Sequence, residues 1–511
     1  MQEEYKIALK NGAGSVNADL YCRPNCGVPV DAAVHTVDPV AADPVADAAQ
    51  KYFGIAYLYP WQRMVIANIL EAAEEGERGN QIVLLPTGAG KSLCFMVPAL
   101  LLKGPTLIIY PLLALMNDQK RRLDEAKLDT VVFRGGQSED ERNECFERIK
   151  RGARFILANP EVLQSGPLVK RLAECTIAHI AIDEAHCVCE WGDSFRPAYL
   201  ELGRIIQQLG CKTVTAFTAT ASDTVLNRVA EVLFANDVHI VRGETDRPNI
   251  HYSVHRRAAK TPALIELVMK EKRPAVVFCA SRSRTKELAL ILRDVLYRRG
   301  ETDTVRFYHA GLTREEKAET EQWFYPKKDA VLISTCAFGM GVDKKDIRTV
   351  IHYDAPSTAE AYVQEAGRAG RDGQPARALL LWALQDKEKA DKQSAEKGER
   401  YAVLSDFANA LSCRREVLLK ALGEENCVCS GCDICEKEAK NTAEDVESFM
   451  RFLCKNRKRY GFKKALSVFC REQNGLYAPI AGSNIVTEED AGEMLYELIK
   501  SGRVDKKKFF I

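Results

Sequence analysis

Short runs of aliphatic and β-branched residues alternate with amphipathic stretches from residue 82 to about residue 245. The runs span residues 82–85, 106–110, 155–158, 177–183 and 213–217. Continuous apolar runs of this length are typical of strands that are buried on both faces of a parallel sheet. Their alternation with helical patterns predicts a doubly wound α/β domain over residues 51–245.

A second series of the same kind begins after residue 250. Its apolar runs span residues 275–280, 305–309, 330–335, 349–354 and 376–382. This series predicts a second doubly wound domain over residues 246–384. Charged helical sequence then leads into a group of cysteines, which predicts a small helical domain over residues 385–436. Residues 437–511 are predicted to form a last small domain, in which residues 442–511 form three helices, the last capped by Thr487 and ended by Gly502.

The N-terminal region lacks both patterns. Residues 28–49 are mostly Ala, Val, Asp and Pro and include no aromatic residue. Their Asp-Pro pairs are expected to break any helix. We therefore predict a flexible extension over residues 1–50.

The charge balance of the whole chain limits where a nucleic acid could bind. Among 511 residues, 72 Lys and Arg face 71 Asp and Glu, for a formal net charge of +1. This excludes a globally basic, histone-like protein, so a nucleic-acid surface must be a local patch. The 17 cysteines are scattered along the chain, which indicates reduced thiols and not a disulfide framework. The apolar stretch 93–102 is too short to cross a bilayer. A cytoplasmic protein is expected.

The segment PTGAGKS (86–92) joins an apolar run to a helical stretch. A glycine-rich turn between a strand and a helix presents backbone N–H groups to phosphate. We expect ATP phosphates to bind to the residues Thr87, Gly88, Ala89, Gly90, Lys91 and Ser92. Lys91 would reach the β- and γ-phosphates, and the Ser92 hydroxyl would hold Mg²⁺. The strict P-loop pattern has glycine at position 85, where this chain has leucine.

The apolar run 177–183 ends in two carboxylates, Asp183 and Glu184. A carboxylate at the C-terminal end of such a strand is placed to bind Mg²⁺ beside a P-loop. We expect Asp183 to ligate magnesium and Glu184 to orient the attacking water. The alternative is a solvated acidic loop.

The segment QEAGRAGRDG (364–373) carries Arg368 and Arg371, three positions apart and expected on one helix face. Arginines that point at a cleft can stabilise charge on a γ-phosphoryl group. The second domain has no P-loop of its own, which predicts one ATP between the two domains with arginines from the second. The alternative is a solvated helix face.

Aromatic residues interleave with an arginine just after the predicted magnesium site. Trp191, Phe195 and Tyr199 surround Arg196. Aromatic rings beside an arginine can stack on unpaired bases, which predicts a single-strand contact at Trp191, Phe195 and Arg196. The alternative is that these rings fill the core.

The group of cysteines comprises five within 23 residues, namely Cys413, Cys427, Cys429, Cys432 and Cys435. Four thiolates suit tetrahedral Zn²⁺, and a site closed by four protein ligands is structural. We therefore predict one structural zinc ion.

Residues 451–471 carry eight Lys and Arg and no acidic residue. Arg457, Lys458 and Arg459 lie at an expected helix-to-helix connection, where their side chains could reach the phosphates of duplex DNA. The alternative is a solvated basic face.

Five motifs occur in the order found in superfamily 2 helicases: PTGAGKS (86–92), DEAH (183–186), TAFTATAS (215–222), AFGMGVD (337–343) and QEAGRAGRDG (364–373). The chain resembles the RecQ family of DNA helicases in particular. Segments 183–203, 246–250, 308–317 and 351–373 also look like that family, and the resemblance covers residues 51–436.

The resemblance implies two tandem RecA-like domains, a zinc knuckle and a small winged-helix-like domain with an incomplete wing. It implies ATP-driven movement on single-stranded DNA, 3′-to-5′ unwinding of forked duplex DNA, and a role in recombination and repair. It also selects the zinc ligands as Cys413, Cys429, Cys432 and Cys435.

The resemblance further implies roles for two glutamines. Gln364 joins the two arginines in the catalytic set, and Gln62 reads the adenine edge. Because Ile55 and Tyr59 stand where relatives carry Tyr and Arg, Tyr57 or Tyr59 is expected to stack on the base.

Two other functions compete with a DNA helicase. An RNA helicase is the first, since a DEAH box alone does not select the substrate, although the aromatic segment and the zinc knuckle favour DNA. A non-catalytic DNA-binding scaffold is the second, and the intact Lys91, Glu184, Arg368 and Arg371 argue against it.

Overall fold

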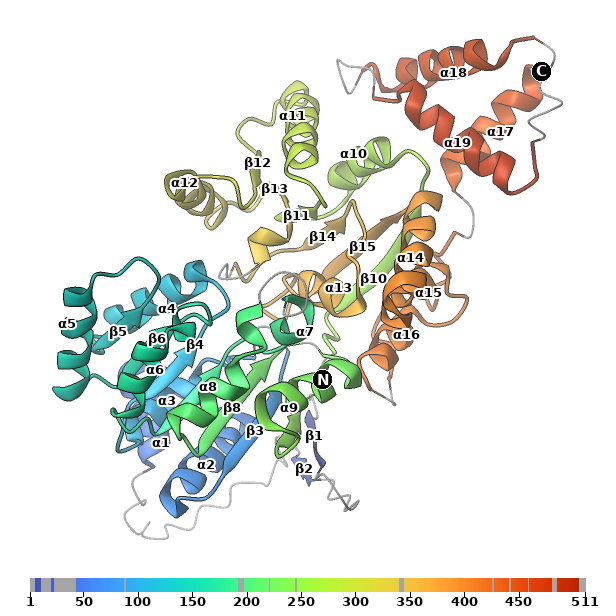
Figure 1. The fold of residues 1–511 in the computed structure, drawn as a ribbon. Coiled ribbons are helices and arrows are strands. Elements are labelled where there is room, and N and C mark those ends of the chain that lie inside the picture. The colour runs from blue at the N-terminus through green and yellow to red at the C-terminus, as the bar shows by residue number, and fades with distance from the viewer. Residues whose placement is uncertain are drawn as a thin grey trace, which may run out of the picture. The chain divides into compact units, whose positions relative to one another are not determined.

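The chain divides into two compact parts, Met1–Asp246 and Arg247–Ile511, called unit 1 and unit 2 below. The computed structural model describes residues 5–10, 20–22, 43–86, 89–191, 197–219, 221–243, 246–339, 344–424, 427–440, 443–457, 459–479 and 485–504 (Figure 1). Within those ranges, every helix is too short or too polar to span a bilayer.

Unit 1 is built on one sheet with the strand order β2-β1-β9-β3-β8-β7-β4-β6-β5. Its strands are β1 (Tyr5–Lys10), β2 (Leu20–Cys22), β3 (Gly79–Leu84), β4 (Thr106–Ile109), β5 (Thr130–Phe133), β6 (Phe155–Ala158), β7 (His179–Ile182), β8 (Thr213–Thr218) and β9 (His239–Arg242). Strands β3 to β9 run parallel, whereas β1 pairs antiparallel with β9 and β2 antiparallel with β1. All five predicted runs are strands, whereas β1, β2, β5 and β9 were not predicted.

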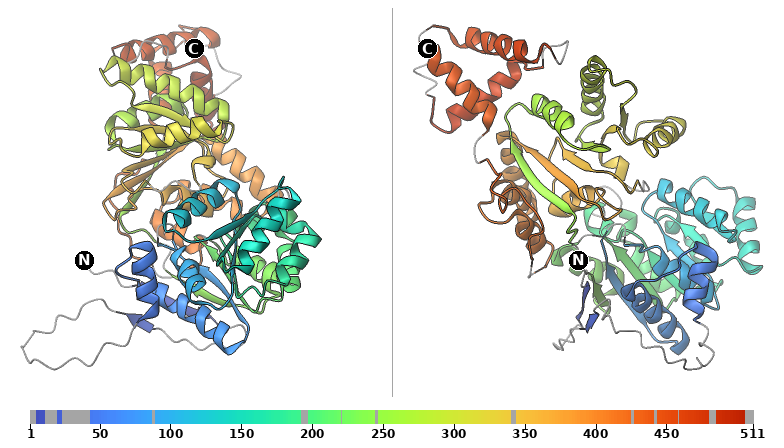
Figure 2. Two further views of the ribbon diagram at one scale, coloured as in Figure 1. Left: turned by 90° about the vertical axis from the view of Figure 1, so that its left-hand side faces the viewer. Right: turned by 180° about the vertical axis from the view of Figure 1, so that it is seen from behind.

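Helices cover both faces of this sheet (Figure 2). They are α1 (Pro44–Phe53), α2 (Pro60–Glu75), α3 (Leu93–Leu101), α4 (Leu113–Glu125), α5 (Glu139–Lys150), α6 (Gly166–Ala173), α7 (Cys187–Trp191), α8 (Leu202–Leu209) and α9 (Asp223–Phe234), with short 3₁₀ turns η1 (Val162–Gln164) and η2 (Pro197–Tyr199). Ile82 and Leu84 of β3 pack in one core with α5, α6, α8 and α9. The equally buried Val83 between them points to the opposite face, as alternation along a strand requires.

The predicted flexible extension is wrong at residues 43–50, which belong to α1. Asp43 is the N-cap of this helix, because its Oδ1 accepts hydrogen bonds from the backbone N–H groups of Val45 (3.1 Å) and Ala46 (3.0 Å). Pro44 occupies the first turn, where a missing N–H has no cost. An Asp-Pro pair therefore starts a helix here instead of breaking one. Strands β1 and β2, which extend the sheet, also contradict the prediction.

Unit 2 contains a parallel sheet with the strand order β10-β15-β14-β11-β13-β12. Its strands are β10 (Ile250–Arg256), β11 (Ala275–Phe278), β12 (Val305–Tyr308), β13 (Val331–Ser334), β14 (Thr349–His352) and β15 (Ala376–Trp382). Every strand except β10 corresponds to a predicted apolar run. The sequence IHYSVHR of β10 mixes polar with apolar residues and lacks such a run.

Helices again cover both faces of the sheet. They are α10 (Lys260–Lys270), α11 (Arg282–Arg298), α12 (Arg314–Phe324), α13 (Ala359–Ala366), α14 (Leu384–Lys397), α15 (Val403–Asn409) and α16 (Arg414–Ala421), with 3₁₀ turns η3 (Cys336–Gly339) and η4 (Glu399–Tyr401). Val277 packs in a core with α10 and α11, whereas the adjacent Val276 packs in the core of α12, α13 and the zinc-binding segment.

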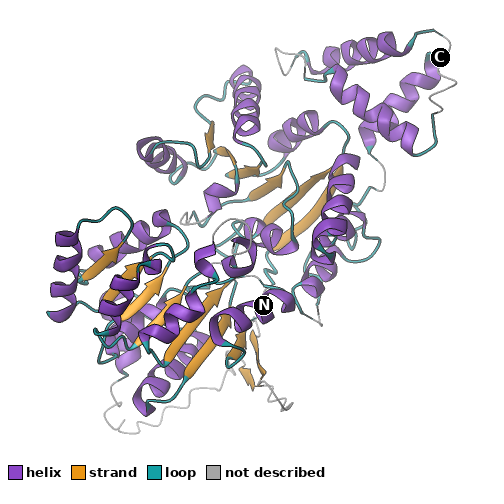
Figure 3. Ribbon diagram, in the orientation of Figure 1, coloured by secondary structure: helices purple, strands orange, loops and turns teal. Residues whose placement is uncertain are grey.

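The C-terminal region is helical in its described part, as predicted (Figure 3). Its helices are α17 (Glu444–Lys455), α18 (Phe462–Tyr477) and α19 (Glu488–Lys500). Thr487 caps α19 through a hydrogen bond from Asp490 N–H to its Oγ1, and Gly502 follows the end of this helix in a left-handed conformation. Asp445 Oδ2 accepts a hydrogen bond of 2.7 Å from Ala259 N–H, which joins this region to the segment before α10. The predicted incomplete wing falls mainly on residues 505–511, outside the described residues.

Candidate functional site

β3, β8 and β7 are neighbouring central strands of the unit 1 sheet. Because they run parallel, their carboxyl ends lie side by side along one edge of the sheet, the edge at which the strands end. Leu85 N–H donates to the carbonyl of Thr218 (3.0 Å), and Ala185 N–H donates to the carbonyl of Phe217 (2.8 Å). The loops that follow these three strands are therefore neighbours. Because ligands bind at the carboxyl ends of strands in such sheets, this edge is the candidate site.

The loop after β3 leads directly into α3. The first hydrogen bonds of the helix begin at Lys91 and Ser92. The carbonyl of Lys91 accepts from Cys94 N–H (2.9 Å), and the carbonyl of Ser92 accepts from Met96 N–H (3.0 Å). Gly90 is required here because its φ is +75° and because a Cβ would lie 2.8 Å from Nε2 of Gln62. The structure places Ala89, Gly90, Lys91 and Ser92 at the N-terminus of α3, as predicted for a phosphate loop. Thr87 and Gly88 lie outside the described residues.

Asp183 is a half-buried carboxylate at the end of β7. Its burial and the neighbouring Glu184 raise its pKa above the ordinary value, while the positive charge of Lys91 acts in the opposite direction. Its Oδ1 accepts a hydrogen bond of 3.1 Å from Glu184 N–H. A half-buried carboxylate next to a second carboxylate is stabilised by a cation, so this donor fits Mg²⁺.

Glu184 has a left-handed backbone with φ of +52°. This conformation costs a non-glycine residue about 1–3 kcal/mol and is common at functional sites. Its Oε2 lies 3.4 Å from Nδ1 of His186, which also lies 3.0 Å from Oγ1 of Thr218 at the end of β8. His186 thus links the DEAH segment to the segment 215–222. This link was not predicted, because no spacing of residues in the sequence indicates it.

Gln62 is buried against the phosphate loop. Its Nε2 donates to the carbonyls of Ala89 (3.2 Å) and Gly90 (3.4 Å), and its Oε1 accepts from Tyr59 N–H (2.9 Å). Tyr59 is half-exposed and stacks on Trp61, with ring centroids 5.8 Å apart. In this structure the side chain of Gln62 therefore holds the phosphate loop. Its contact with adenine stays a prediction.

Arg368 and Arg371 do not share a helix face, so that prediction is wrong. Helix α13 carries Gln364 in its last turn and ends at Ala366, after which residues 367–372 form consecutive turns. Gly370 ends any helical continuation, because its φ is +57° and a Cβ there would lie 2.4 Å from Nδ2 of Asn249. Both arginines belong to this turn instead, and Arg368 is buried.

Four of the five cysteines come together in unit 2. The Sγ atoms of Cys413, Cys429, Cys432 and Cys435 lie within 4.8 Å of one another. Burial opposes ionisation of Cys432, yet hydrogen bonds from the N–H groups of Cys435 and Arg414 hold the pKa of its thiol below the ordinary value. This donor set fits one zinc ion. Cys427 lies outside the cluster.

The two predicted DNA-binding segments are described in part. The side chain of Trp191, and both Phe195 and Arg196, lie outside the described residues, as does Lys458. Tyr199 is buried in the core of unit 1, which agrees with the core alternative for that ring. Arg457 and Arg459 are exposed in the connection between α17 and α18.

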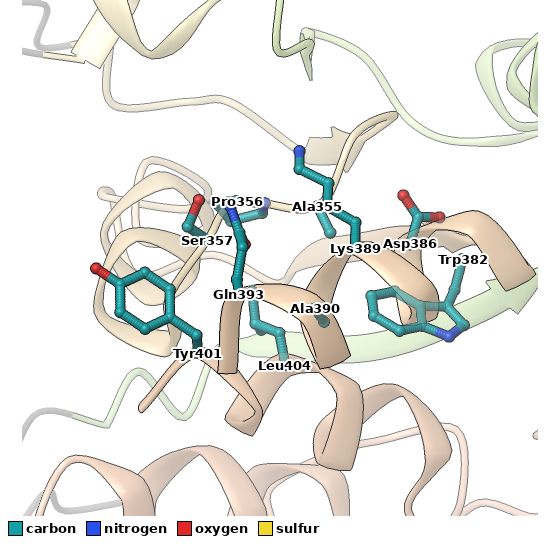
Figure 4. A pocket seen from close by; sticks show the side chains of 10 residues that line it. All are labelled: Ala355, Pro356, Ser357, Trp382, Asp386, Lys389, Ala390, Gln393, Tyr401 and Leu404. Atoms are coloured by element: carbon teal, nitrogen blue, oxygen red, sulfur yellow. The ribbon is translucent and has the colours of Figure 1, made fainter. Parts of the chain in front are cut away.

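A hollow lies beside the loop after β14 in unit 2 (Figure 4). Ala355, Pro356 and Ser357 form one wall, and side chains of α14 and η4 form the other. Its volume of about 10 Å³ is enough for one water molecule. It therefore contributes nothing to a nucleotide site.

Three protein families match this chain. They are the DEAD/DEAH box helicase over residues 59–229, the helicase conserved C-terminal domain over residues 259–373, and the RecQ zinc-binding family over residues 377–436. The predicted cofactors, ATP with Mg²⁺ and Zn²⁺, agree with these families and with the cysteine cluster.

Two curated relatives are similar over most of the chain. An ATP-dependent DNA helicase RecQ of Pasteurella multocida (strain Pm70) is 31% identical over 403 residues, which cover 76% of this chain and 63% of that protein. An ATP-dependent DNA helicase RecQ of Bacillus subtilis (strain 168) is 30% identical over 440 residues, which cover 83% of this chain and 72% of that protein. The chain thus spans less than two thirds of the Pasteurella multocida relative.

A solved structure supports the fold. The structure of Mss116p (NTE and C-tail double deletion) bound to ssRNA and AMP-PNP matches with a TM-score of 0.56 and 16% identity. The match covers 92% of this chain and 87% of that one. At this identity the likeness concerns the fold alone.

Proposed function

Because this chain belongs to the RecQ family of helicases, we propose that it is an ATP-dependent DNA helicase that moves along single-stranded DNA and unwinds forked duplexes with 3′-to-5′ polarity. It acts in recombination and repair, in the bacterial cytoplasm or nucleoid. The observation that carries the proposal is the convergence of the Lys91 loop and the Asp183–Glu184 pair at one sheet edge. The four-cysteine cluster in the same chain supports the choice of DNA.

In unit 1, the residues of the sheet edge bind and orient ATP. The backbone N–H groups at the start of α3 and the ammonium group of Lys91 hold the phosphates. Ser92 and Asp183 would hold Mg²⁺, which adds positive charge beside the γ-phosphate. Glu184 orients the water that attacks this phosphate, and its strained backbone is supported by the His186–Thr218 contact.

In unit 2, Gln364, Arg368 and Arg371 are proposed to act on the same nucleotide when the units close. Arginine side chains stabilise the charge that spreads over the transferred phosphoryl group. Closing on ATP and opening after hydrolysis would couple the chemical cycle to steps along one strand. Trp191, Phe195 and Arg196 are proposed to contact that strand by stacking.

The central experiment compares substrates in parallel. ATP hydrolysis is measured with single-stranded DNA, duplex DNA and single-stranded RNA at equal nucleotide concentrations. We expect stimulation by single-stranded DNA, and we expect unwinding of duplexes with a 3′ single-stranded tail but not of those with a 5′ tail. Stronger stimulation by RNA would favour an RNA helicase, and the absence of hydrolysis on every substrate would favour a scaffold.

The basic stretch 451–471 is proposed to anchor duplex DNA. Its exposed cations lie on α17, on α18 and in their connection, and include Arg451, Lys455, Arg457, Arg459, Lys463, Lys464 and Arg471. The first turn of α18 carries Lys463 and Lys464, although helix N-termini favour acidic residues. Cations placed against the local preference suggest an external anion such as DNA phosphate.

Replacing Arg457, Lys458 and Arg459 together by alanine should weaken binding to forked DNA and flatten its salt dependence. Each lost duplex phosphate contact lowers the log–log salt slope by about 0.9. Fluorescence anisotropy across a salt series measures the slope, and hydrolysis stimulated by single-stranded DNA should be retained. The matched control replaces the exposed Lys387, Lys389 and Lys392 of α14, which lie among acidic residues, and should keep the slope. An unchanged slope in the first variant would show that the stretch does not touch DNA.

A further inference from the structure

The turn that carries the two arginines is held by a side chain from the start of unit 2. Nη1 of Arg247 donates to the carbonyl of Gly367 (3.1 Å), and its Nη2 donates to the carbonyls of Ala369 (3.2 Å) and Gly370 (2.7 Å). One guanidinium therefore binds three carbonyls that flank Arg368 and precede Arg371. A planar group with fixed donor directions locks the turn more firmly than a single hydrogen bond could.

Asn249 reinforces this clamp from the same segment. Its Nδ2 donates to the carbonyls of Gly370 (2.8 Å) and Gln374 (2.9 Å). The carbonyl of Gly370 thus accepts from both side chains. The left-handed Gly370 allows this approach, because any Cβ at that position would collide with the Asn249 amide.

The backbone of this clamp is in turn held by α16, the helix that begins directly after the zinc ligand Cys413. Arg415 is fully buried, and its Nη1 donates to the carbonyl of Arg247 (3.2 Å) while its Nη2 donates to the carbonyl of Ile250. Its guanidinium lies 5.0 Å from the ring centroid of Tyr252. A buried arginine that binds two carbonyls around one turn fixes the path of that backbone.

The zinc knuckle is attached to the same strand. Tyr252 N–H donates to the carbonyl of Gly431 (3.4 Å), and Asp433 N–H donates to the carbonyl of Tyr252 (3.1 Å). The Asp433 carboxylate accepts from Val254 N–H (3.0 Å) and forms a buried ion pair with Arg414. Hydrogen bonds, together with the backbone of α16 between Arg414 and Arg415, therefore connect the cysteine cluster to the arginine turn.

We propose that Arg247 is a positioning residue for Arg368 and Arg371, and that the zinc-binding segment acts on ATP hydrolysis through Arg415 and this clamp. The inference rests on the proposed function, because it assumes that the two arginines act on the γ-phosphate. A displacement of about 1 Å of a catalytic group can cost roughly 100-fold in rate. The clamp thus makes the zinc-binding segment part of the catalytic apparatus as well as a structural element.

The test measures steady-state ATP hydrolysis with single-stranded DNA for Arg247→Ala, Arg247→Lys, Arg371→Ala and the double variant Arg247→Ala/Arg371→Ala. Arg247→Ala should lower kcat by about 10- to 100-fold and leave KM for ATP nearly unchanged, because the phosphates are held by unit 1. Arg247→Lys keeps the charge but cannot reach three carbonyls, so its kcat should also fall. In the double variant the two losses should combine to less than their product, because Arg247→Ala acts in part through Arg371.

Hydrogen–deuterium exchange gives a readout that is independent of activity. In Arg247→Ala and in Arg415→Lys, the amides of residues 367–373 should exchange faster, while zinc analysis still finds one ion per chain. The matched control is Arg256→Ala. Arg256 is the last residue of β10, and its Nη2 donates to the carbonyl of Ala408 (3.0 Å) and to Oδ1 of Asn409 (3.0 Å). Its loss should change neither kcat nor exchange at residues 367–373.

The outcomes separate the two levels of inference. Normal hydrolysis in Arg371→Ala would refute the arginine role in the proposed function, and the positioning role with it. Impaired hydrolysis in Arg371→Ala together with normal hydrolysis in both Arg247 variants would refute the positioning role alone. A double variant whose loss equals the full product of the two single losses would show that Arg247 acts independently of Arg371, which also overturns the proposal.

Discussion

Replacement of Lys91 by alanine will abolish ATP hydrolysis, and Glu184→Gln will slow it by about 10²–10⁴-fold while ATP still binds. Lys91 is the ammonium group at the start of α3, and its loss removes the charge that holds the phosphates. Glu184→Gln keeps the size of the side chain and removes only the carboxylate that orients water. Steady-state hydrolysis and binding of a fluorescent ATP analogue distinguish the two effects.

The matched control for these variants is Lys103→Ala. Lys103 is exposed just beyond the C-terminal end of α3, whereas Lys91 precedes the N-terminal end, so Lys103 lies far from the phosphate loop. Its replacement should leave hydrolysis and binding unchanged. Normal hydrolysis in Glu184→Gln would be incompatible with the assignment of Glu184 to the attacking water.

Cys432→Ser will remove zinc and unfold the segment 413–435. Cys432 is the buried member of the cluster, and its neighbours Gly431 and Asp433 are hydrogen-bonded to β10. A structural zinc site of this type contributes about 10–16 kcal/mol of apparent binding free energy in zinc-finger peptides, and that energy is folding energy. Without the ion, the Asp433–Arg414 pair loses the frame that holds it. Metal analysis and limited proteolysis around residue 425 measure the two effects.

Cys427→Ser is the control, because Cys427 lies two residues from Cys429 but outside the cluster. It should keep one zinc ion per chain and the wild-type proteolysis pattern. A zinc-free wild-type protein with a fully protected segment 413–435 would refute the assignment of a structural metal site.

Most strands that are buried on both faces of the sheet were predictable from the sequence, although the largely buried β5 was missed. Runs such as IVLL and FILA contain almost nothing but large apolar residues, because helices cover the strand from both sides. β10 was missed because its outer edge meets the zinc knuckle and its residues His251, Ser253 and His255 interrupt the apolar run. α1 was missed because the Asp43-Pro44 pair was interpreted as a helix breaker, although side-chain capping by Asp43 starts the helix.

The candidate site was predictable as far as local motifs extend. The phosphate loop, Asp183 and Glu184 follow from a strand that ends in characteristic residues. The spacing of Arg368 and Arg371 predicted a helix that Gly370 prevents. The clamp by Arg247 and Arg415 could not be predicted, because its partners are far apart in the sequence and backbone carbonyls carry no sequence signal.

The position of β10 at the sheet edge has a consequence for synthesis of the chain. β10 pairs with β15, whose partner residues are made more than a hundred residues later, and its other edge is covered by Gly431–Asp433 later still. At typical rates of translation, roughly 10–35 s pass between the emergence of β10 and that of its last neighbour. During this interval the nascent strand exposes unsatisfied N–H and C=O groups that can pair with another chain. Pauses in translation within residues 257–431 are therefore expected to increase aggregation on the ribosome, and binding of a chaperone to β10 should suppress it.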